Sequence, residues 1–471
     1  DLVDNPEAVP DLARSTTSSL LPSGEYDHLI ITSQELSAPF QELAEWKGER
    51  RERGSVYDNV RSVTVTLEHI LGVSQFWGYP SSHGGTGNDT QTIVRNFIIA
   101  AHQEWGVQYV LIGGDDDVIP ARMVKAPIYD PDFNELTADI YFSGLDGDWD
   151  SDGDGVYGEL YGLVGEDEAD LLAEVFVGRA TVSTVDQAWN FVNKTIGYEM
   201  GYSNQYADDV LLIGEVLDSK TYGDIYKQEV WNLVLADEGL DRSTLYAGDG
   251  TFSASAVLAA MGSDVHVINH MGHGNFGYLA GLYNYNIQTL DNDLPFIMYT
   301  QACMVAGFDE KEDEPGDCIA EEFVQGTGGT VAFIGNSRFG WYSPGNTDGS
   351  SQKFDISFFS QVYDDGVTDL GRALSNSKEE WATLASSAGT IRWVYLELNL
   401  LGDPETRVHL PGREMSDLAV QEIEIERAIL GEPCSVMVRV QNLGQSNDTG
   451  SLGLLVNGEE IGNRTVSLGP G

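Results

Sequence analysis

Two residues with reactive side chains, His273 and Cys303, each follow closely after an apolar run. Residues 265–269 precede the histidine, and residues 294–300 precede the cysteine. Each run predicts a buried strand, and in an open α/β sheet ligands bind where the carboxyl ends of the strands meet. An imidazole beside a thiol can take the thiol proton and later return it to a leaving amine. The pattern therefore predicts a cysteine nucleophile with a histidine base.

Other interpretations of these residues stay open. A lone cysteine is often a small buried apolar residue, and a histidine can simply end a strand. Cys318 is a rival nucleophile because it opens a predicted helix after Pro315-Gly316-Asp317, and a helix N-terminus can lower a thiol pKa. Cys303 is preferred because its strand is adjacent in sequence to the one that ends at His273. With only 3 cysteines, the third being Cys434, no disulfide framework is expected.

A second motif occupies residues 148–159, where carboxylates alternate along a glycine-containing loop. The spacing matches an EF-hand calcium loop, with a glycine at the sharp turn and a glutamate in twelfth position that can bind through both oxygens. The flanks do not predict helices, so we expect an isolated loop with a structural calcium; a solvated acidic loop is the alternative. The expected ligands are Asp148, Asp150, Asp152, Asp154, Val156 and Glu159.

The elements that must position these residues alternate between strand and helix. Apolar runs at 29–32, 63–67 and 107–112, with a helical pattern at 90–105, predict a mainly parallel sheet. A second α/β unit begins near 208–214, after a predicted connecting helix at 187–202. Short alternating runs at 435–441 and 450–456, with a turn at Asn457-Gly458, predict an immunoglobulin-type β-sandwich.

Four segments follow from these patterns. Residues 1–23 form a polar leader or pro-segment remnant; 24–205 form an amino-terminal α/β subdomain with the calcium loop; 206–411 form a catalytic α/β subdomain; and 412–471 form a β-sandwich that we expect to be truncated.

Composition narrows the classes of function. The formal net charge of −50 over 471 residues argues against nucleic-acid binding, which needs basic surface, and favours solubility in salt or binding of hard cations. No apolar run reaches the roughly 18 residues needed to span a bilayer. The start at Asp1 predicts a processed chain, so we expect a secreted or extracellular protein, with attachment to a cell surface left open.

Several of these motifs resemble the gingipain family of cysteine endopeptidases, relatives of caspases and clostripain. Gly272-His273-Gly274 and Gln301-Ala302-Cys303 are similar to its catalytic segments, and the resemblance extends over roughly residues 24–410 through segments 26–32, 318–323, 328–335 and 400–404. It implies a two-part, caspase-like α/β catalytic region whose mainly parallel sheets are flanked by helices. It also implies Cys303 as nucleophile, His273 as base, and the backbone N–H groups of Gly272 and Cys303 as an oxyanion hole.

A catalytic imidazole commonly needs an acceptor that fixes its orientation. Glu215 follows the predicted strand 210–214 and resembles the acidic residue near the family's histidine. Glu174, at the start of another strand, is the alternative. We favour Glu215, and a Cys-His pair can also act without a third member.

The resemblance further implies a pocket for a basic substrate residue. Asp224 falls where arginine-specific members carry the pocket acid, and Met271, Gln301 and Trp341 match other lining positions, although Met271 and Gln301 depart from the expected types. Cleavage after Arg or Lys would permit self-processing at Arg14, Arg50, Arg51 or Arg53, in segments that we expect to be exposed. The competing functions are a calcium-braced adhesion or scaffold protein with an inactive peptidase-like domain, and a transpeptidase that uses the same acyl-enzyme.

Overall fold

The computed structural model describes most of the chain. The described residues are 20–55, 57–77, 89–126, 135–160, 167–200, 206–309, 316–411, 418–425, 436–442, 448–456 and 459–468. Most of the expected leader, the Asn457-Gly458 turn, Arg14 and Cys434 lie outside these ranges.

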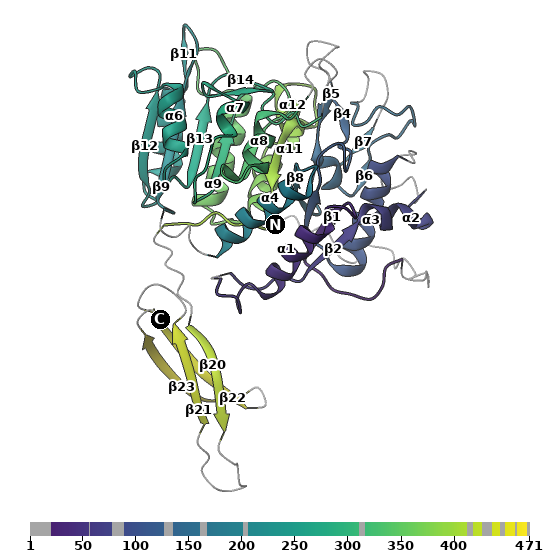
Figure 1. Ribbon diagram of the computed structural model, residues 1–471, viewed down its shortest axis with the longest axis vertical. Coiled ribbons are helices and arrows are strands. Elements are labelled where there is room, and N and C mark those ends of the chain that lie inside the picture. The colour runs from purple at the N-terminus through teal and green to yellow at the C-terminus, as the bar shows by residue number, and fades with distance from the viewer. Residues whose placement is uncertain are drawn as a thin grey trace.

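A ten-stranded sheet forms the centre of the molecule (Figure 1). In spatial order its strands are β12 (Asp241–Tyr246), β9 (Asp209–Gly214), β13 (Val267–Met271), β17 (Phe296–Thr300), β18 (Thr330–Asn336), β19 (Leu398–Gly402), β8 (Phe176–Ala180), β3 (Tyr109–Gly113), β1 (His28–Thr32) and β2 (Ser62–Thr66). Strands β12 to β18 pair in parallel, as do β8 to β2, and β19 is antiparallel to β18. The prediction of a large, mostly parallel α/β sheet flanked by helices is confirmed.

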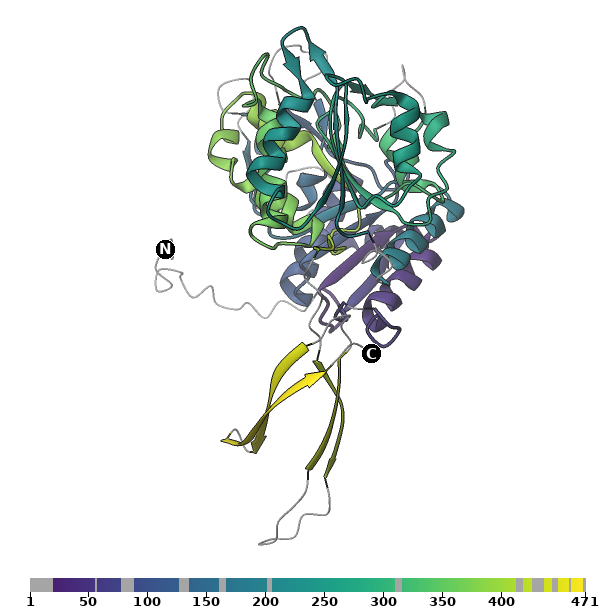
Figure 2. The same ribbon diagram turned by 90° about the vertical axis from the view of Figure 1, so that its left-hand side faces the viewer.

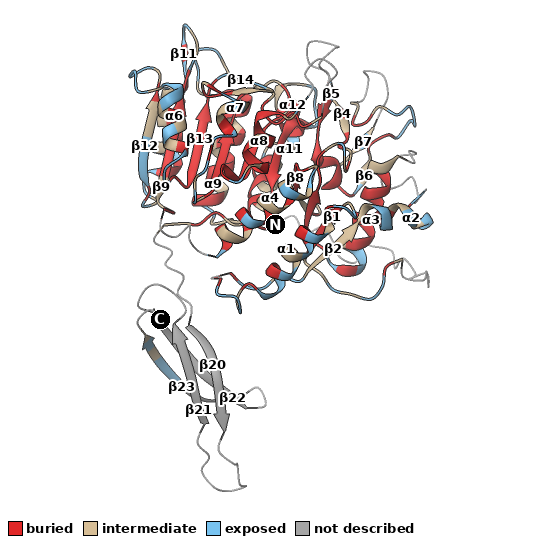
Figure 3. Cartoon of the chain, viewed as in Figure 1, coloured by how far each residue is buried: buried red, intermediate tan, exposed pale blue. Residues whose placement is uncertain are grey.

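Alternate strand residues pack on opposite faces of the sheet, as the two-residue period of a strand requires. Leu29 and Ile31 of β1 join one apolar core, whereas Ile30 joins the other. The first core packs helices α2 (Leu67–Gly72), α3 (Thr90–Trp105), α5 (Gly223–Val230), α9 (Ser350–Tyr363), α10 (Leu370–Glu379), α11 (Ala382–Ala385) and α12 (Thr390–Glu397). The second packs α1 (Ser37–Glu49), α4 (Val185–Glu199), α6 (Ala254–Met261), α7 (Asn284–Ile287) and α8 (Ile319–Gln325). Figure 2 shows the helices on both sides, and Figure 3 shows the buried strands between them.

Short elements decorate the edges of this sheet. They are β4 (Met123–Lys125), β5 (Glu135–Thr137), β6 (Gly147–Asp148), β7 (Glu168–Ala169), β10 (Val216–Asp218), β11 (Thr221–Tyr222), β14 (Gly274–Asn275), β15 (Tyr278–Leu279), β16 (Leu282–Tyr283), and the 3₁₀ helices η1 (Ser74–Phe76) and η4 (Asp139–Phe142). The π-helix η6 (Trp231–Leu235) continues α5. The β10–β11 hairpin and the three strands β14, β15 and β16 follow directly from β9 and β13, so they stand beside the carboxyl ends of those two strands.

A cluster of buried charged side chains joins the segment just after β19 to helix α1. Lys47 of α1 contacts Asp403, just after β19, at 3.2 Å and Glu405 at 2.7 Å. Arg50 donates to both oxygens of Glu405 at 2.8 Å, and it also reaches Glu199 of α4. Arg50 is only 1% exposed, so the expectation that it lies on an exposed segment open to self-processing is wrong.

The carboxyl-terminal strands form two antiparallel pairs, β20 (Leu418–Ile425) with β21 (Val436–Asn442) and β22 (Asp448–Val456) with β23 (Glu459–Leu468). The two pairs touch through β20 and β22. An immunoglobulin-like module remains a prediction. Within the described residues, every helix is too short or too polar to cross a bilayer.

Candidate active site

The sheet register brings His273 and Cys303 to matched positions. His270 of β13 lies opposite Thr300 of β17 in the parallel pairing, and each reactive residue follows its paired residue by three positions. Beyond the strands the two segments still touch: a Cβ placed on Gly274 would lie 2.8 Å from the Cβ of Ala302 and 3.1 Å from the Cys303 carbonyl oxygen. The structure thus places the two segments predicted to hold base and nucleophile in direct contact.

The Cys303 thiol is half-buried and lies 3.8 Å from the Gly340 carbonyl oxygen, which follows β18. Burial raises the pKa of this thiol to about 11, with a smaller contribution from the Glu397 carboxylate. Met304, the next residue, has a φ of 61°, a left-handed conformation that costs a non-glycine residue about 1–2 kcal/mol. Its N–H donates to the Arg338 carbonyl oxygen at 2.6 Å, which holds the turn. Because its pKa is about 11, the Cys303 thiol is protonated at neutral pH and needs a base to become a thiolate.

The His273 ring is exposed and is oriented by a backbone group. Its Nε2 lies 3.1 Å from the carbonyl oxygen of Leu217 in β10. A carbonyl oxygen only accepts hydrogen bonds, so this contact requires the proton on Nε2 and leaves Nδ1 of the neutral ring as the proton acceptor. The hairpin that follows β9 thus sets the tautomer of His273.

Glu215, expected to orient His273, instead contacts the other histidine of the motif. Its Oε1 lies 3.0 Å from Nε2 of the fully buried His270, whose Nδ1 lies 2.8 Å from the Thr300 hydroxyl. The same hydroxyl accepts the Ala302 N–H at 3.1 Å. A chain of contacts therefore runs from Glu215 to the residue before Cys303. The alternative, Glu174, lies just before β8 and accepts the Leu145 N–H at 2.5 Å.

Cys318, the rival nucleophile, caps helix α8 and is 1% exposed. Its own N–H donates to Oε2 of Glu321 at 2.5 Å. Burial raises the pKa of its thiol well above the ordinary value, so the helix terminus does not activate it. It lies in the second apolar core.

Two loops wall the site. The Tyr342 hydroxyl donates to Asp218 at 3.1 Å, and the Gly345 N–H donates to the Thr221 hydroxyl at 2.7 Å, so the β10–β11 hairpin is fastened to the segment after β18. Between them lies a cavity of about 220 Å³, lined by Lys220, Thr221, Tyr222, Ile225, Tyr226, Gly345, Asn346, Thr347 and Gln352.

The residues expected to line a substrate pocket follow one another along this edge. Asp224 is half-buried in the first turn of α5, and a Cβ on the preceding Gly223 would lie 2.6 Å from the Met271 carbonyl oxygen. The Gln301 N–H donates to the His270 carbonyl oxygen at 3.3 Å, and Gln301 also abuts Gly340, the residue before Trp341. The side chain of Gln301 is already committed, because its Nε2 donates to Asp355 at 2.9 Å. Met271 is buried, and Asp224 is not part of the 220 Å³ cavity.

Comparison with known proteins settles the family. The model of peptidase family C25 matches residues 21–409. The chain belongs to peptidase family C25. The resemblance to gingipains is thereby confirmed, and this C25 protein is a cysteine-type peptidase, a hydrolase whose substrates are proteins or peptides. None of the curated proteins matches it significantly.

Solved structures share the C25 fold at low identity. The Arg-specific cysteine proteinase gingipain R has a TM-score of 0.61 and 16% identity, covering 96% of this chain and 91% of its own. A complex of the pro- and mature domains of RgpB from Porphyromonas gingivalis has a TM-score of 0.60 and 16% identity, covering 93% and 91%. A third structure, described only as a protease, has a TM-score of 0.61 and 14% identity, covering 94% and 89%.

The acidic loop of this C25 peptidase folds its carboxylates together. One oxygen each of Asp152, Asp154 and Glu159 lies within 4.8 Å of the others, and a second such group joins Asp150, Asp152 and Asp167. Gly153 makes the turn with a φ of 75°. Asp167 follows the predicted loop by eight positions and was not anticipated; burial raises the pKa of its carboxyl group to about 6. Asp148 accepts the Asp150 N–H at 3.2 Å, and with Val156 it stays among the predicted ligands.

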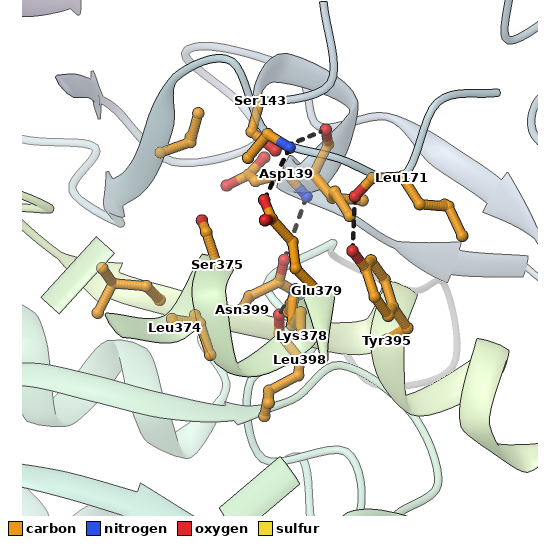
Figure 4. A pocket seen from close by; sticks show the side chains of 14 residues that line it. Asp139, Ser143, Leu171, Leu374, Ser375, Lys378, Glu379, Tyr395, Leu398 and Asn399 are labelled. Carbon is orange, nitrogen blue, oxygen red and sulfur yellow. Dashed lines mark hydrogen bonds between the residues drawn. The ribbon is translucent and has the colours of Figure 1, made fainter. Parts of the chain in front are cut away.

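A separate cavity of about 30 Å³ lies between η4 and α10 (Figure 4). The Lys378 ammonium donates to the Leu398 carbonyl oxygen at 2.6 Å, and the Tyr395 hydroxyl donates to that of Leu171 at 2.6 Å. A space this small holds about one water molecule. Neither His273 nor Cys303 lines it, so it has no part in the peptidase site.

Proposed function

We propose that this C25 peptidase is a secreted endopeptidase in which Cys303 is the nucleophile and His273 the general base, cleaving after Arg or Lys. The observation that supports the catalytic pair is its placement: both residues follow mutually paired strand residues by three positions, and their segments touch through Gly274. His270, the other histidine at this strand end, is fully buried and already contacts Glu215 and Thr300.

The chemistry follows from the states of the two groups. With its thiol pKa near 11, Cys303 is protonated at neutral pH, and His273, protonated on Nε2, offers Nδ1 to take that proton. The thiolate attacks the scissile carbonyl, and the imidazolium then protonates the leaving amine. A water molecule, deprotonated by the same imidazole, releases the acyl group. The backbone N–H groups of Gly272 and Cys303 are the proposed donors to the oxyanion.

Basic specificity rests on Asp224 at the start of α5, whose carboxylate lies against Gly248, just after β12, while the preceding Gly223 meets the Met271 backbone. A half-buried carboxylate there can accept a charge-assisted hydrogen bond from the guanidinium or ammonium group of the substrate. Gln301 and Trp341 are the proposed walls of this pocket. Arg51 and Arg53, whose side chains are 31% and 41% exposed, are the remaining described candidates for self-processing.

We also propose that the 148–159 loop binds a structural calcium ion. The fit is supported by its donor set, since gathered carboxylate oxygens with a glycine turn suit a hard cation. Asp150, Asp152, Asp154, Asp167 and Glu159 would hold the ion. Its role would be to neutralise the loop and brace the amino-terminal half of the sheet.

The test of the proposed function is a panel of fluorogenic peptides that differ only in the residue before the cleaved bond, assayed with and without a thiol alkylator. We expect alkylator-sensitive cleavage of the Arg and Lys peptides. Cleavage that persists after complete alkylation of Cys303 would contradict the proposed nucleophile, whereas sensitive cleavage without basic preference would contradict only the pocket.

A further inference from the structure

The chain at the end of strand β18 runs alongside the turn that carries Cys303. The carbonyl oxygen of Asn336, the last residue of β18, accepts the Ala306 N–H at 3.0 Å. Two positions further on, the Arg338 carbonyl oxygen accepts the Met304 N–H at 2.6 Å. The far side of the nucleophile turn is therefore fixed to the backbone that follows β18.

The side chain of Asn336 holds the near side of the same turn. Its Nδ2 donates to the carbonyl oxygen of Gln301 at 3.1 Å and to that of Ala302 at 3.2 Å. Asn336 is 1% exposed, so water does not compete for these hydrogen bonds. Because a carbonyl oxygen only accepts, the amide must present its two N–H groups to the turn. Both donors of Asn336 are thus used on the two peptide groups just before Cys303.

The second of these hydrogen bonds sets the direction of the Cys303 N–H. The Ala302 carbonyl and the Cys303 N–H belong to one peptide group, which is planar and trans. The C=O and the N–H of a trans peptide point in opposite directions, so the carbonyl held toward Asn336 turns the Cys303 N–H away from it. A hydrogen bond to the carbonyl also polarises the peptide group, which makes its N–H a stronger donor.

The Cys303 N–H is available to a substrate. Within the described part of the chain, no backbone or side-chain oxygen accepts it. Burial raises the pKa of the Cys303 thiol, whereas the N–H of the same residue acts to lower it, so this N–H lies close to the sulfur. A carbonyl group under attack by that sulfur would bring its oxygen within reach of the N–H.

We propose that Asn336 is a positioning residue of the peptidase site, which aims the Cys303 N–H at the oxyanion formed during acyl transfer. This inference rests on the proposed function, because it needs Cys303 as the nucleophile. When the thiolate attacks, a C–S bond forms and the π electron pair of the scissile carbonyl moves to its oxygen. The Cys303 N–H donates to that oxyanion until the C–N bond breaks and His273 protonates the leaving amine. Asn336 itself touches neither the substrate nor the reacting atoms.

Parallel measurements of cleavage, thiol alkylation and aldehyde binding test this role in Asn336→Ala. For the fluorogenic peptide that the wild type cleaves fastest, kcat should fall by about 10²-fold, as after loss of an oxyanion donor, with KM nearly unchanged. Iodoacetamide reacts with the same sulfur without forming an oxyanion, so its rate should match the wild type. A peptide aldehyde, whose adduct puts an oxygen in the oxyanion position, should bind more weakly, whereas the matching peptide alcohol should not.

A second buried asparagine supplies the matched control. Asn399 of β19 is 3% exposed, and its Nδ2 also donates to two carbonyl oxygens, those of Thr137 and Glu397, at 2.9 Å each. Asn399→Ala should lower the free energy of unfolding in urea while the folded protein keeps the wild-type kcat. Equal losses of kcat in Asn399→Ala and Asn336→Ala would make the effect one of general packing and would overturn the proposal.

Asn336→Asp provides a variant of the same shape and carries the test if Asn336→Ala does not fold. Burial raises the pKa of such a carboxyl group, and its single O–H can restore one of the two hydrogen bonds, so kcat should lie between those of Asn336→Ala and the wild type. Wild-type kcat and aldehyde affinity in a folded Asn336 variant would overturn the proposal. Equal losses of cleavage and alkylation would do the same, since they would place the effect on the thiol. Wild-type cleavage that persists after alkylation of Cys303 would instead contradict the proposed function.

Discussion

His273 Nε2 lies 3.1 Å from the carbonyl oxygen of Leu217, so the backbone of the β10–β11 hairpin orients the proposed catalytic base, and no carboxylate of the described residues bonds to the ring. A carbonyl fixes the tautomer but adds no negative charge to stabilise the imidazolium that forms in the reaction. The imidazolium therefore has to be stabilised within the Cys303–His273 pair itself.

Cys303→Ala should abolish peptidase activity while leaving the fold intact, because it removes the only thiol at the matched strand ends. Cys318→Ala should keep most activity, since that thiol is buried in the core at the cap of α8. Steady-state cleavage of a basic fluorogenic peptide, with circular dichroism as the check on folding, measures both. Cleavage by Cys303→Ala at the wild-type rate would rule out the mechanism.

Alkylation of Cys303 by iodoacetamide should depend on His273. In His273→Ala burial and the Glu397 carboxylate still raise the pKa of the thiol, so the rate should keep rising with pH up to about 11. At pH 7 its thiolate fraction would be on the order of 10⁻⁴. The wild type should react much faster near neutral pH, because the imidazole accepts the proton. Identical pH profiles for the two proteins would show that His273 does not act on the thiol.

Glu215 should matter through His270 rather than through the catalytic base. Glu215→Ala leaves Nε2 of the buried His270 without its partner, which should lower the free energy of unfolding by about 1–3 kcal/mol. Glu215→Gln can still contact the ring through its amide and should retain most of both stability and kcat. Urea unfolding and kinetics on the two variants provide the measurement. A stable Gln variant with kcat reduced by several hundredfold would instead place the Glu215 charge in catalysis.

Peptides with Arg or Lys before the scissile bond should be cleaved faster than Ala, Leu or Asp peptides by at least roughly 10², which corresponds to about 3 kcal/mol of transition-state binding. Asp224→Asn should flatten this preference while leaving the alkylation rate of Cys303 nearly unchanged, because pocket and nucleophile are separate groups. The comparison of kcat/KM across the panel decides it. Equal turnover of neutral and basic peptides by the wild type would eliminate the pocket assignment alone.

Chelation of calcium should lower the melting temperature, and Asp150→Ala or Asp167→Ala should reproduce that loss without a chelator. The reason is repulsion among the gathered carboxylates of the loop. Asp291→Ala, which alters an exposed acid outside the gathered carboxylates, serves as the matched control. A melting temperature indifferent to chelator and to both substitutions would remove the loop from the list of metal sites.

The position of each residue after its strand predicted that the segments of His273 and Cys303 lie together, because parallel strands bring their carboxyl ends to one edge whatever their distance in sequence. The helix at 90–105 was predicted to the residue, because Asp89 caps it and Gly106 ends it. The Leu217 carbonyl could not be found from sequence, since every residue carries a backbone oxygen and only a specific hairpin aims one at His273. Asp167 was missed because its contact with the loop depends on the chain returning to it. His270 was overlooked beside His273, although a histidine inside an apolar run signals a buried partner.

The buried charges at the end of β19 bear on the order in which the chain can assemble. Arg50 and Glu405, which are bonded to each other, are separated by 355 positions in sequence. During synthesis from the amino terminus, α1 would present Lys47 and Arg50 without Asp403 and Glu405 until almost all of the peptidase region had emerged. Such a distant closure slows folding, because the chain entropy is lost before the contact forms. The buried ion pairs between α1 and the segment after β19 can therefore form only after every strand of the central sheet has been synthesised.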